Sequence, residues 1–278
     1  MMLNVLNTQL YRLKKSKLFW ALLIVCAVLP LISAIFTTAV IEIVSNAFGE
    51  EDVGLLEAFR GEGGEVTLSM LSGLVSLGSN PALFSLICSS IFLSGEFSGG
   101  AIRNMILANK SRTQIFLSFL SVALIIGFSY LGVSYVSTLL CFGVAMGFDG
   151  ITVNAAVNGC MSTFFLGLLT IALVQACVCL FLFCTRKTGP TVAFPILIII
   201  LAPSIITTIV EIVVGVRALI GQSVSEISLS WIPLSNMDLF NASNVDGALV
   251  GKIVLYNLPL AALFATFGWL AISKADLK

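Results

Sequence analysis

The sequence predicts an all-α integral membrane protein with six transmembrane helices, and three observations lead to this fold class. The first is composition: of 278 residues, 58% are hydrophobic and 10% are charged, whereas charged residues make up about 25% of soluble proteins. The second is the presence of six long apolar runs. The third is that nearly all basic residues fall on one predicted side of these runs.

The apolar runs set the boundaries of the predicted spans. A hydrocarbon layer of about 30 Å needs about 20 helical residues. The runs lie at 18–41, 68–95, 114–146, 152–184, 189–213 and 249–272. The third and fourth are longer than one straight span needs, so we expect them to tilt or to extend beyond the lipid. Residues 1–278 then form a single transmembrane domain with outer loops at 42–67 and 214–248.

The distribution of basic residues predicts the orientation of this domain. With the N-terminus inside, eleven Lys and Arg residues lie on the cytoplasmic side and three on the outer side, as the positive-inside rule requires. The inner set is Arg12, Lys14, Lys15, Lys17, Arg103, Lys110, Arg112, Arg186, Lys187, Lys274 and Lys278, and the outer set is Arg60, Arg217 and Lys252. We expect a multi-pass protein of the cell membrane with both termini in the cytoplasm. A formal net charge of zero excludes a general binder of nucleic acid.

The first residues predict a helix at the membrane surface. Leucines recur at spacings of three and four in residues 3–17, and a cluster of basic residues follows them. Such an amphipathic helix lies along the lipid, with its cations at the headgroups. The alternative is a simple topogenic tail, which places the N-terminus on the same side.

The fifth apolar run contains three prolines, Pro190, Pro195 and Pro203. Each removes a backbone donor, so this run is predicted to be bent or to begin as a broken helix whose freed carbonyls need other partners. A broken helix can line a passage or can merely be kinked, and both readings stay open.

Residue types that carry autonomous catalysis are missing from the sequence. It contains no His, no phosphate-binding loop of the Walker A type and no GxSxG elbow. Its seven cysteines lie in or at the edges of the apolar runs, where they behave as small hydrophobic residues, so we expect no metal site. We therefore expect no catalytic site in this chain.

A short polar island at 95–112 separates the second and third runs, and it carries Glu96, Arg103, Lys110 and Arg112. Gly95 and the pair Gly99-Gly100 are predicted to break the second span. Residues 101–108 can then form two turns of helix along the inner surface, with apolar contacts from Ile102, Met105, Ile106 and Leu107 and with Arg103 facing water. Ser111 is predicted to cap the third span.

This island resembles the membrane subunit of an ABC-2 type ATP-binding cassette transporter. In that family a glutamate opens the cytoplasmic segment after span two, a Gly-Thr pair and an apolar-basic helix follow, and a Ser-Arg pair precedes span three. Glu96, the stretch Gly99-Gly100-Ala101-Ile102-Arg103-Asn104 and the pair Ser111-Arg112 follow that order. Gly100 stands where Thr is usual, Asn109-Lys110 replaces a Gly-containing turn, and Ser118 stands where Lys often follows.

The resemblance implies a half-transporter that pairs with a second copy or a paralogue and binds two separately encoded ATPase subunits. ATP and magnesium would be bound by those subunits, and this chain would hold no cofactor. The segment 98–109 would be a coupling helix seated on the ATPase, and the amphipathic helix at 3–17 would lie against it. The residues implied in this coupling are Glu96, Gly99, Gly100, Ile102, Arg103, Met105, Ile106, Ser111 and Arg112.

The leading hypothesis is thus a permease of an ATP-driven exporter for a peptide, an antibiotic or a lipid-like substrate in the surrounding membrane. One alternative is a membrane-bound sensor or assembly partner that transports nothing. Another is an ion-coupled secondary carrier, which is disfavoured because no charged residue lies clearly within a span.

Overall fold

The structure is a computed structural model that describes residues 2–48, 79–99, 105, 111–146, 153–219 and 247–274, and every element in this part of the chain is helical. The elements are α1 (Met2–Lys15), α2 (Lys17–Phe48), α5 (Ser79–Ser98), α7 (Arg112–Met146), α8 (Val153–Thr185), α9 (Thr188–Pro195), the π-helical turn η1 (Ile196–Leu201), α10 (Ala202–Leu219) and α12 (Gly247–Lys274).

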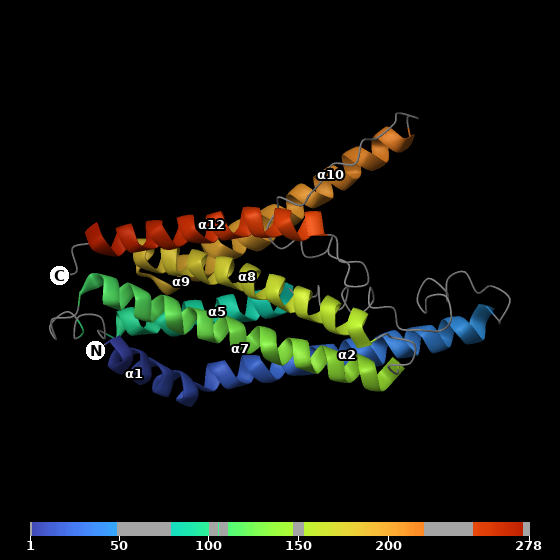
Figure 1. Cartoon of the computed structure of the whole chain (residues 1–278), viewed down its shortest axis with the longest axis horizontal. Coiled ribbons are helices and arrows are strands. Elements are labelled where there is room, and N and C mark those ends of the chain that lie inside the picture. Colours follow the sequence, from blue (N-terminus) through green and yellow to red (C-terminus); the bar gives the residue numbers. More distant parts are fainter. Residues whose placement is uncertain are drawn as a thin grey trace.

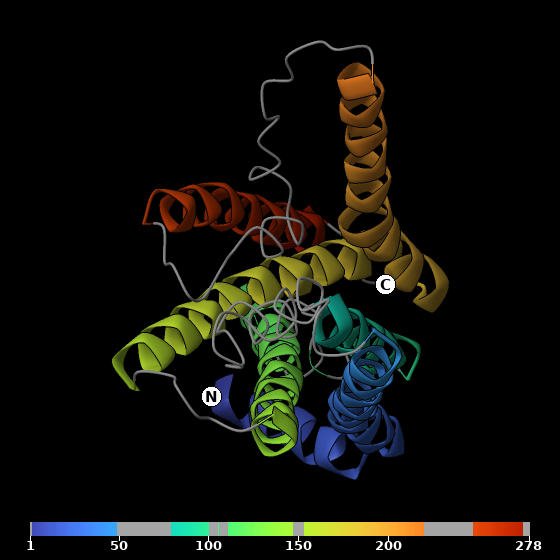
Figure 2. The ribbon, with the colours of Figure 1, turned by 90° about the vertical axis from the view of Figure 1, so that its right-hand side faces the viewer.

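The long helices form an elongated bundle around α5, α7 and α8 (Figure 1). In this bundle α2 packs along α7, and α12 packs along α8. The short helix α1 lies at one end of the bundle, at an angle to α2, and packs on α7. The helix α10 slants away from the other helices, which is also visible along the bundle axis (Figure 2). We call the end that holds α1 the α1 end.

Five described helical segments are long and apolar enough to cross a membrane: Lys17–Phe36, Arg112–Cys141, Met161–Thr185, Thr188–Val214 and Val250–Lys274. These correspond to the first, third, fourth, fifth and sixth predicted runs. The apolar stretch of α5, Pro81–Phe97, is shorter, and the earlier part of the second predicted run, 68–78, lies outside the described residues. The chain is therefore a multi-pass helical membrane protein.

The predicted break at Gly95 needs correction, and helical residues extend into both predicted outer loops. The helix α2 continues to Phe48, so the first residues of the predicted outer loop at 42–67 are helical. At the second loop, 214–248, α10 continues to Leu219 and α12 begins at Gly247. Gly95 lies inside α5, which ends only at Ser98, because a single glycine costs a helix about 1 kcal/mol and the neighbouring turns supply the remaining hydrogen bonds. The rest of both predicted loops lies outside the described residues.

The fifth predicted run is broken where its prolines occur. The helix α9 ends at Pro195, the π-helical turn η1 follows, and α10 begins one residue before Pro203. Because Pro195 has no N–H, the carbonyl of Thr191 lacks its helical donor, and the Ser90 hydroxyl of α5 donates to it at 3.1 Å. The prediction that this run is bent or broken, with a freed carbonyl bonded to another group, is confirmed by the π-helical turn and the bond from Ser90.

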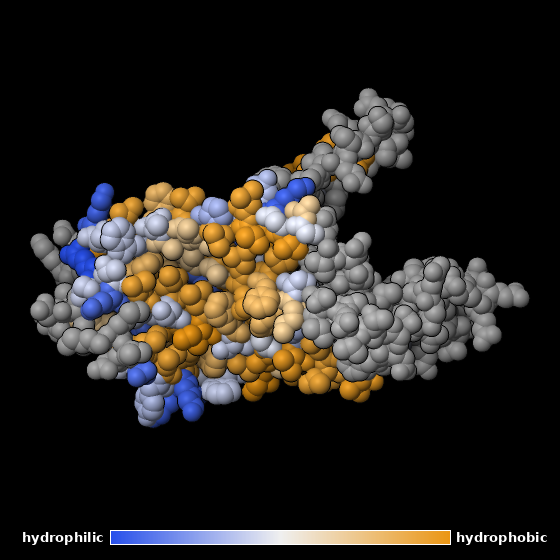
Figure 3. Space-filling view, in the orientation of Figure 1, coloured by the Kyte–Doolittle hydropathy of each residue, from blue (hydrophilic) through white to orange (hydrophobic). Residues whose placement is uncertain are grey.

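Hydrophobic and hydrophilic side chains occupy different zones along the length of the bundle (Figure 3). An apolar band covers its middle, and hydrophilic side chains gather mainly at the α1 end. The described basic residues at this end are Arg12, Lys14, Lys15, Lys17, Arg112, Arg186, Lys187 and Lys274, whereas Lys252 lies near the opposite end at the beginning of α12. The predicted grouping of most basic residues on one side of the spans is thus seen as a cluster at the α1 end of the bundle.

Candidate functional site at the α1 end

The surface helix α1 is joined to the first long helix by a defined corner at Ser16. The Ser16 N–H donates to the Leu13 carbonyl at 2.9 Å, and the Ser16 hydroxyl accepts from the Phe19 N–H at 3.4 Å as an N-cap of α2. The indole N–H of Trp20 donates to the Lys14 carbonyl at 2.8 Å. These bonds join the end of α1 to the first turn of α2.

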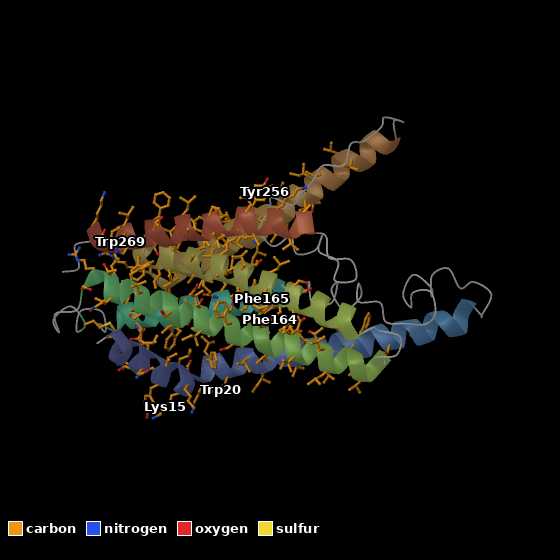
Figure 4. The ribbon with its side chains drawn as sticks, viewed as in Figure 1. Lys15, Trp20, Phe164, Phe165, Tyr256 and Trp269 are labelled. Atoms are coloured by element: carbon orange, nitrogen blue, oxygen red, sulfur yellow. The ribbon has the colours of Figure 1, made fainter. Side chains whose placement is uncertain are left out.

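The outer face of this corner is basic and aromatic. Lys15 and Trp20 project from the same side of the bundle (Figure 4), and the Lys15 ammonium lies 4.5 Å from the centre of the Tyr11 ring. On the inner face, Leu13 is buried and Leu6 and Leu10 pack against the same core. The predicted amphipathic pattern is therefore confirmed, with a packed inner face and an outer face of the kind found at headgroups.

An ion pair ties α1 to the end of α5. The Arg12 atom Nη1 lies 2.8 Å from Oε2 and 3.1 Å from Oε1 of Glu96. The Glu96 side chain is 9% exposed and that of Arg12 is 53% exposed, so the carboxylate lies in the packed end and the guanidinium reaches it from the surface. A carboxylate removed from water in this way depends on its partner, because an unpaired buried charge is costly.

The first residues of the predicted coupling segment continue directly from this ion pair. The Gly99 N–H donates to the Gly95 carbonyl at 2.9 Å, and a Cβ at Gly99 would lie 3.1 Å from that oxygen. Met105 is half-buried and packs against the core cluster that includes Leu13 and Phe119. Gly100, Ile102, Arg103 and Ile106 lie outside the described residues, so their coupling role stays a prediction.

The segment ends at a helix cap, as predicted. The Ser111 hydroxyl accepts from the Gln114 N–H at 3.3 Å, and its carbonyl accepts from the Ile115 N–H at 3.1 Å. The first bond satisfies a donor of the first turn of α7 that lacks a partner within the helix, and the second is the first backbone hydrogen bond of that helix. Ser111 therefore determines where α7 begins.

Arg112 contacts the last turn of α12, which sequence reasoning missed. Its Nη1 donates to the carbonyl oxygens of Ile272, at 3.4 Å, and Ser273. Close by, the Trp269 indole N–H donates to the Thr113 hydroxyl at 3.2 Å. The only signal in the sequence is that a basic residue begins one helix and a tryptophan lies near the end of another, which does not identify the partners.

An aromatic cluster underlies both contacts. The rings of Phe97, Phe116, Phe119 and Phe183, from α5, α7 and α8, lie within 5.5–5.9 Å of one another in four pairs. Phe97 follows Glu96, and Phe116 lies one turn beyond Arg112. Aromatic pairs at such distances contribute more stability than their buried area alone would give. The C-terminal end of α5 and the first turns of α7 therefore pack on a shared aromatic cluster.

The helices α1, α5, α7, α8 and α12 thus meet at the α1 end, and the residues at the two ends of the polar island contact α1 and α12. Glu96 contacts α1, and Arg112 contacts α12. The groups gathered here are an ion pair, a helix cap and packed rings, so the arrangement can hold and transmit a displacement.

The sequence profile of the ABC-2 family transporter proteins matches residues 5–207, nearly three quarters of the chain. The chain belongs to this family. No curated protein and no solved structure matches it. ABC-2 proteins are membrane components of ATP-binding cassette transporters, which generally work with separate ATPase subunits and are not themselves catalytic. The family inferred from the polar island is therefore confirmed.

Proposed function

We propose that this ABC-2 protein is the permease subunit of an ATP-driven exporter, with the α1 end seated on its ATPase partner. The observation that carries the proposal is the placement of Glu96 and Arg112, which lie at the two ends of the polar island and contact two different helices. A partner that displaces the island would move both α1 and α12. The family match supplies the transporter context for this geometry.

The proposed topology has six spans, with α5 as part of the second and α9, η1 and α10 together as the fifth. Both termini lie in the cytoplasm, because the basic residues gather at the α1 end. Two permeases, identical or paralogous, would combine with two ATPase subunits, which bind ATP and magnesium. The chain itself holds no cofactor in this proposal.

The proposed substrate is a peptide, an antibiotic or a lipid-like molecule taken from the membrane or its surface. In support, the described helices present broad apolar faces, and two pairs of buried polar residues, Gln175 with Ser85 and Asn257 with Thr170, bond to one another between helices. A charged relay for ion coupling would need ionisable groups within the bundle, and the described buried groups there are hydroxyls, amides and thiols.

The first test is the composition and activity of the complex purified from its native membrane through a tag on this chain. We expect an ATP-binding cassette subunit to copurify and ATP hydrolysis to be inhibited by vanadate. Inverted membrane vesicles should take up a dye-labelled cationic peptide or a fluorescent phospholipid when ATP is added, and a proton ionophore should leave this uptake unchanged. Uptake that needs an ion gradient and no ATP would contradict the proposal.

The second test changes the polar island. The double variant Gly99→Pro with Arg103→Glu removes the Gly99 N–H that bonds to Gly95 and reverses one charge of the predicted coupling helix. It should abolish ATP-dependent uptake while the chain still inserts. Lys252→Glu is the matched charge reversal at the opposite end of the bundle and should transport normally. Normal uptake by the double variant would show that the island does not couple.

A further inference from the structure

The last turn of α12 is a place where backbone acceptors need partners. The final four carbonyls of a helix have no intrahelical donor and carry partial negative charge. Arg112 supplies a donor to two of them, those of Ile272 and Ser273. This contact joins the first turn of α7 to the last turn of α12.

A second contact one turn earlier makes the connection rigid. The Trp269 indole N–H bonds to Thr113 at 3.2 Å, so two consecutive residues of α7 hold successive turns of α12. Gly268 brings the helices close: a Cβ there would lie 3.1 Å from the Phe116 ring and 3.3 Å from the Leu180 backbone. Trp269 lies at the α1 end of α12, whereas Tyr256 lies near its opposite end (Figure 4).

The rest of α12 is held differently. It packs along α8, and Asn257 is buried where its amide donates to Thr170 of α8 at 3.3 Å. Leu255 and Leu258, on either side of Asn257 in sequence, are more than half exposed. The helix is thus tied to α7 at its C-terminal turn and rests along α8 with a largely open outer face.

We propose that Arg112 is a positioning residue that makes α12 follow the first turn of α7, so that movement of the polar island reaches the last transmembrane helix. This inference rests on the proposed function, because the island moves only if an ATPase acts on it. The contact of Arg112 with α12 would be a second route for this movement, beside the route from Glu96 through Arg12 to α1 and α2.

The test measures whether α12, following α7, moves relative to α8 when nucleotide binds. Spin labels are placed at Met161→Cys on α8 and Leu258→Cys on α12, which are both exposed, after Cys141, Cys160 and Cys184 are replaced by Ala. The purified complex in lipid nanodiscs should show a distance between the labels that changes when ATP and vanadate are added. Arg112→Ala should lose this change and should lower ATP-dependent uptake by about fivefold or more, within the usual range of coupling between sites.

Two controls separate coupling from folding. Arg112→Lys keeps the positive charge and should restore most of the distance change. Trp269→Phe keeps the ring and loses the donor, and should have a smaller effect of the same kind. In each variant the ATPase should still copurify, which a collapsed α1 end would prevent.

The outcomes distinguish this inference from the proposed function. If no ATPase copurifies with the unmodified chain, the proposed function fails and the inference fails with it. If the unmodified complex responds to nucleotide and Arg112→Ala responds equally, only the role of Arg112 is overturned. The same holds if the complex hydrolyses ATP but the distance between α8 and α12 never changes.

Discussion

The helix α8 and the span formed by α9, η1 and α10 are similarly apolar, yet α8 is buried in the bundle and the other span is mostly exposed. In Met161–Thr185, the apolar stretch of α8, more than half of the side chains are buried, whereas in Thr188–Val214 few of the described side chains are. Both segments consist largely of aliphatic and small side chains. Apolarity therefore predicts that a segment enters the membrane, and it does not predict which segments pack together.

The polar residues of the two segments explain more of the difference. On α8, Gln175 donates to Ser85 of α5 at 3.1 Å, and Thr170 accepts from Asn257 of α12 at 3.3 Å. On α10, the hydroxyls of Ser204 and Thr208 bond to carbonyls of their own helical segment at 2.7 and 2.8 Å. A hydroxyl satisfied within its own helix can face lipid, whereas an amide in lipid needs a partner on another helix.

The backbones of α7 and α8 also approach closely, which stabilises the packing of α8. A Cβ at Gly127 of α7 would lie 2.4 Å from the Ile171 side chain of α8, and one at Gly167 of α8 would lie 3.2 Å from Leu131 of α7. Each helix thus supplies a glycine where the other presents a large side chain. Small residues at such contacts are the usual basis of helix packing in lipid.

The largest difference between the two segments should appear when a large side chain is truncated. Leu173 of α8 is fully buried, and Ile209 of α10 is 55% exposed. Leu173→Ala should cost about 2 kcal/mol or more of unfolding free energy because it leaves a cavity, whereas Ile209→Ala should stay within about 0.5 kcal/mol. Reversible unfolding in mixed detergent micelles measures both values.

A large loss at Ile209 would break the comparison. It would mean that α10 is covered in solution, and a second copy of the chain would be the first candidate. Chemical crosslinking of the unmodified protein at two concentrations would then distinguish a cover supplied by a partner chain from one supplied by the chain itself.

Removing a hydroxyl should have a smaller effect on stability, and it should be larger for a hydroxyl bonded to another helix than for one bonded only within its own. Ser85 and Ser204 each bond to a carbonyl of their own helical segment, but Ser85 also accepts from Gln175. Ser85→Ala should cost about 0.6 kcal/mol, the average for a hydrogen bond between membrane helices, and Ser204→Ala should cost less than about 0.3 kcal/mol. The same unfolding measurement serves, and equal losses would show that the bond to Gln175 contributes nothing.

Local patterns in the sequence predicted much of this fold. The third predicted run, 114–146, matches α7 to within two residues, because length and apolarity alone define a lone membrane helix. The cap at Ser111 and the break near Pro195 were also predictable, since both follow from which backbone donors and acceptors lack helical partners.

Contacts between distant residues were beyond this reasoning. Arg12 and Glu96 are 84 positions apart, and Arg112 and Ile272 are 160 apart. Eleven basic residues fall on the predicted inner side. Any of them could have been the partner of Glu96, so the sequence did not identify Arg12. The carbonyls that Arg112 caps belong to the backbone, which has no signature in the sequence. Packing geometry decides both contacts.

The Arg12–Glu96 ion pair gives the most direct test of the account, because it joins the polar island to the surface helix. Arg12→Glu and Glu96→Arg should each lower ATP-dependent uptake into inverted vesicles by about fivefold or more, measured with the probe that the unmodified complex transports. Combining them should recover much of that uptake, because the reversed pair can reform. If all three variants transport like the unmodified chain, the α1 end does not transmit the action of the ATPase.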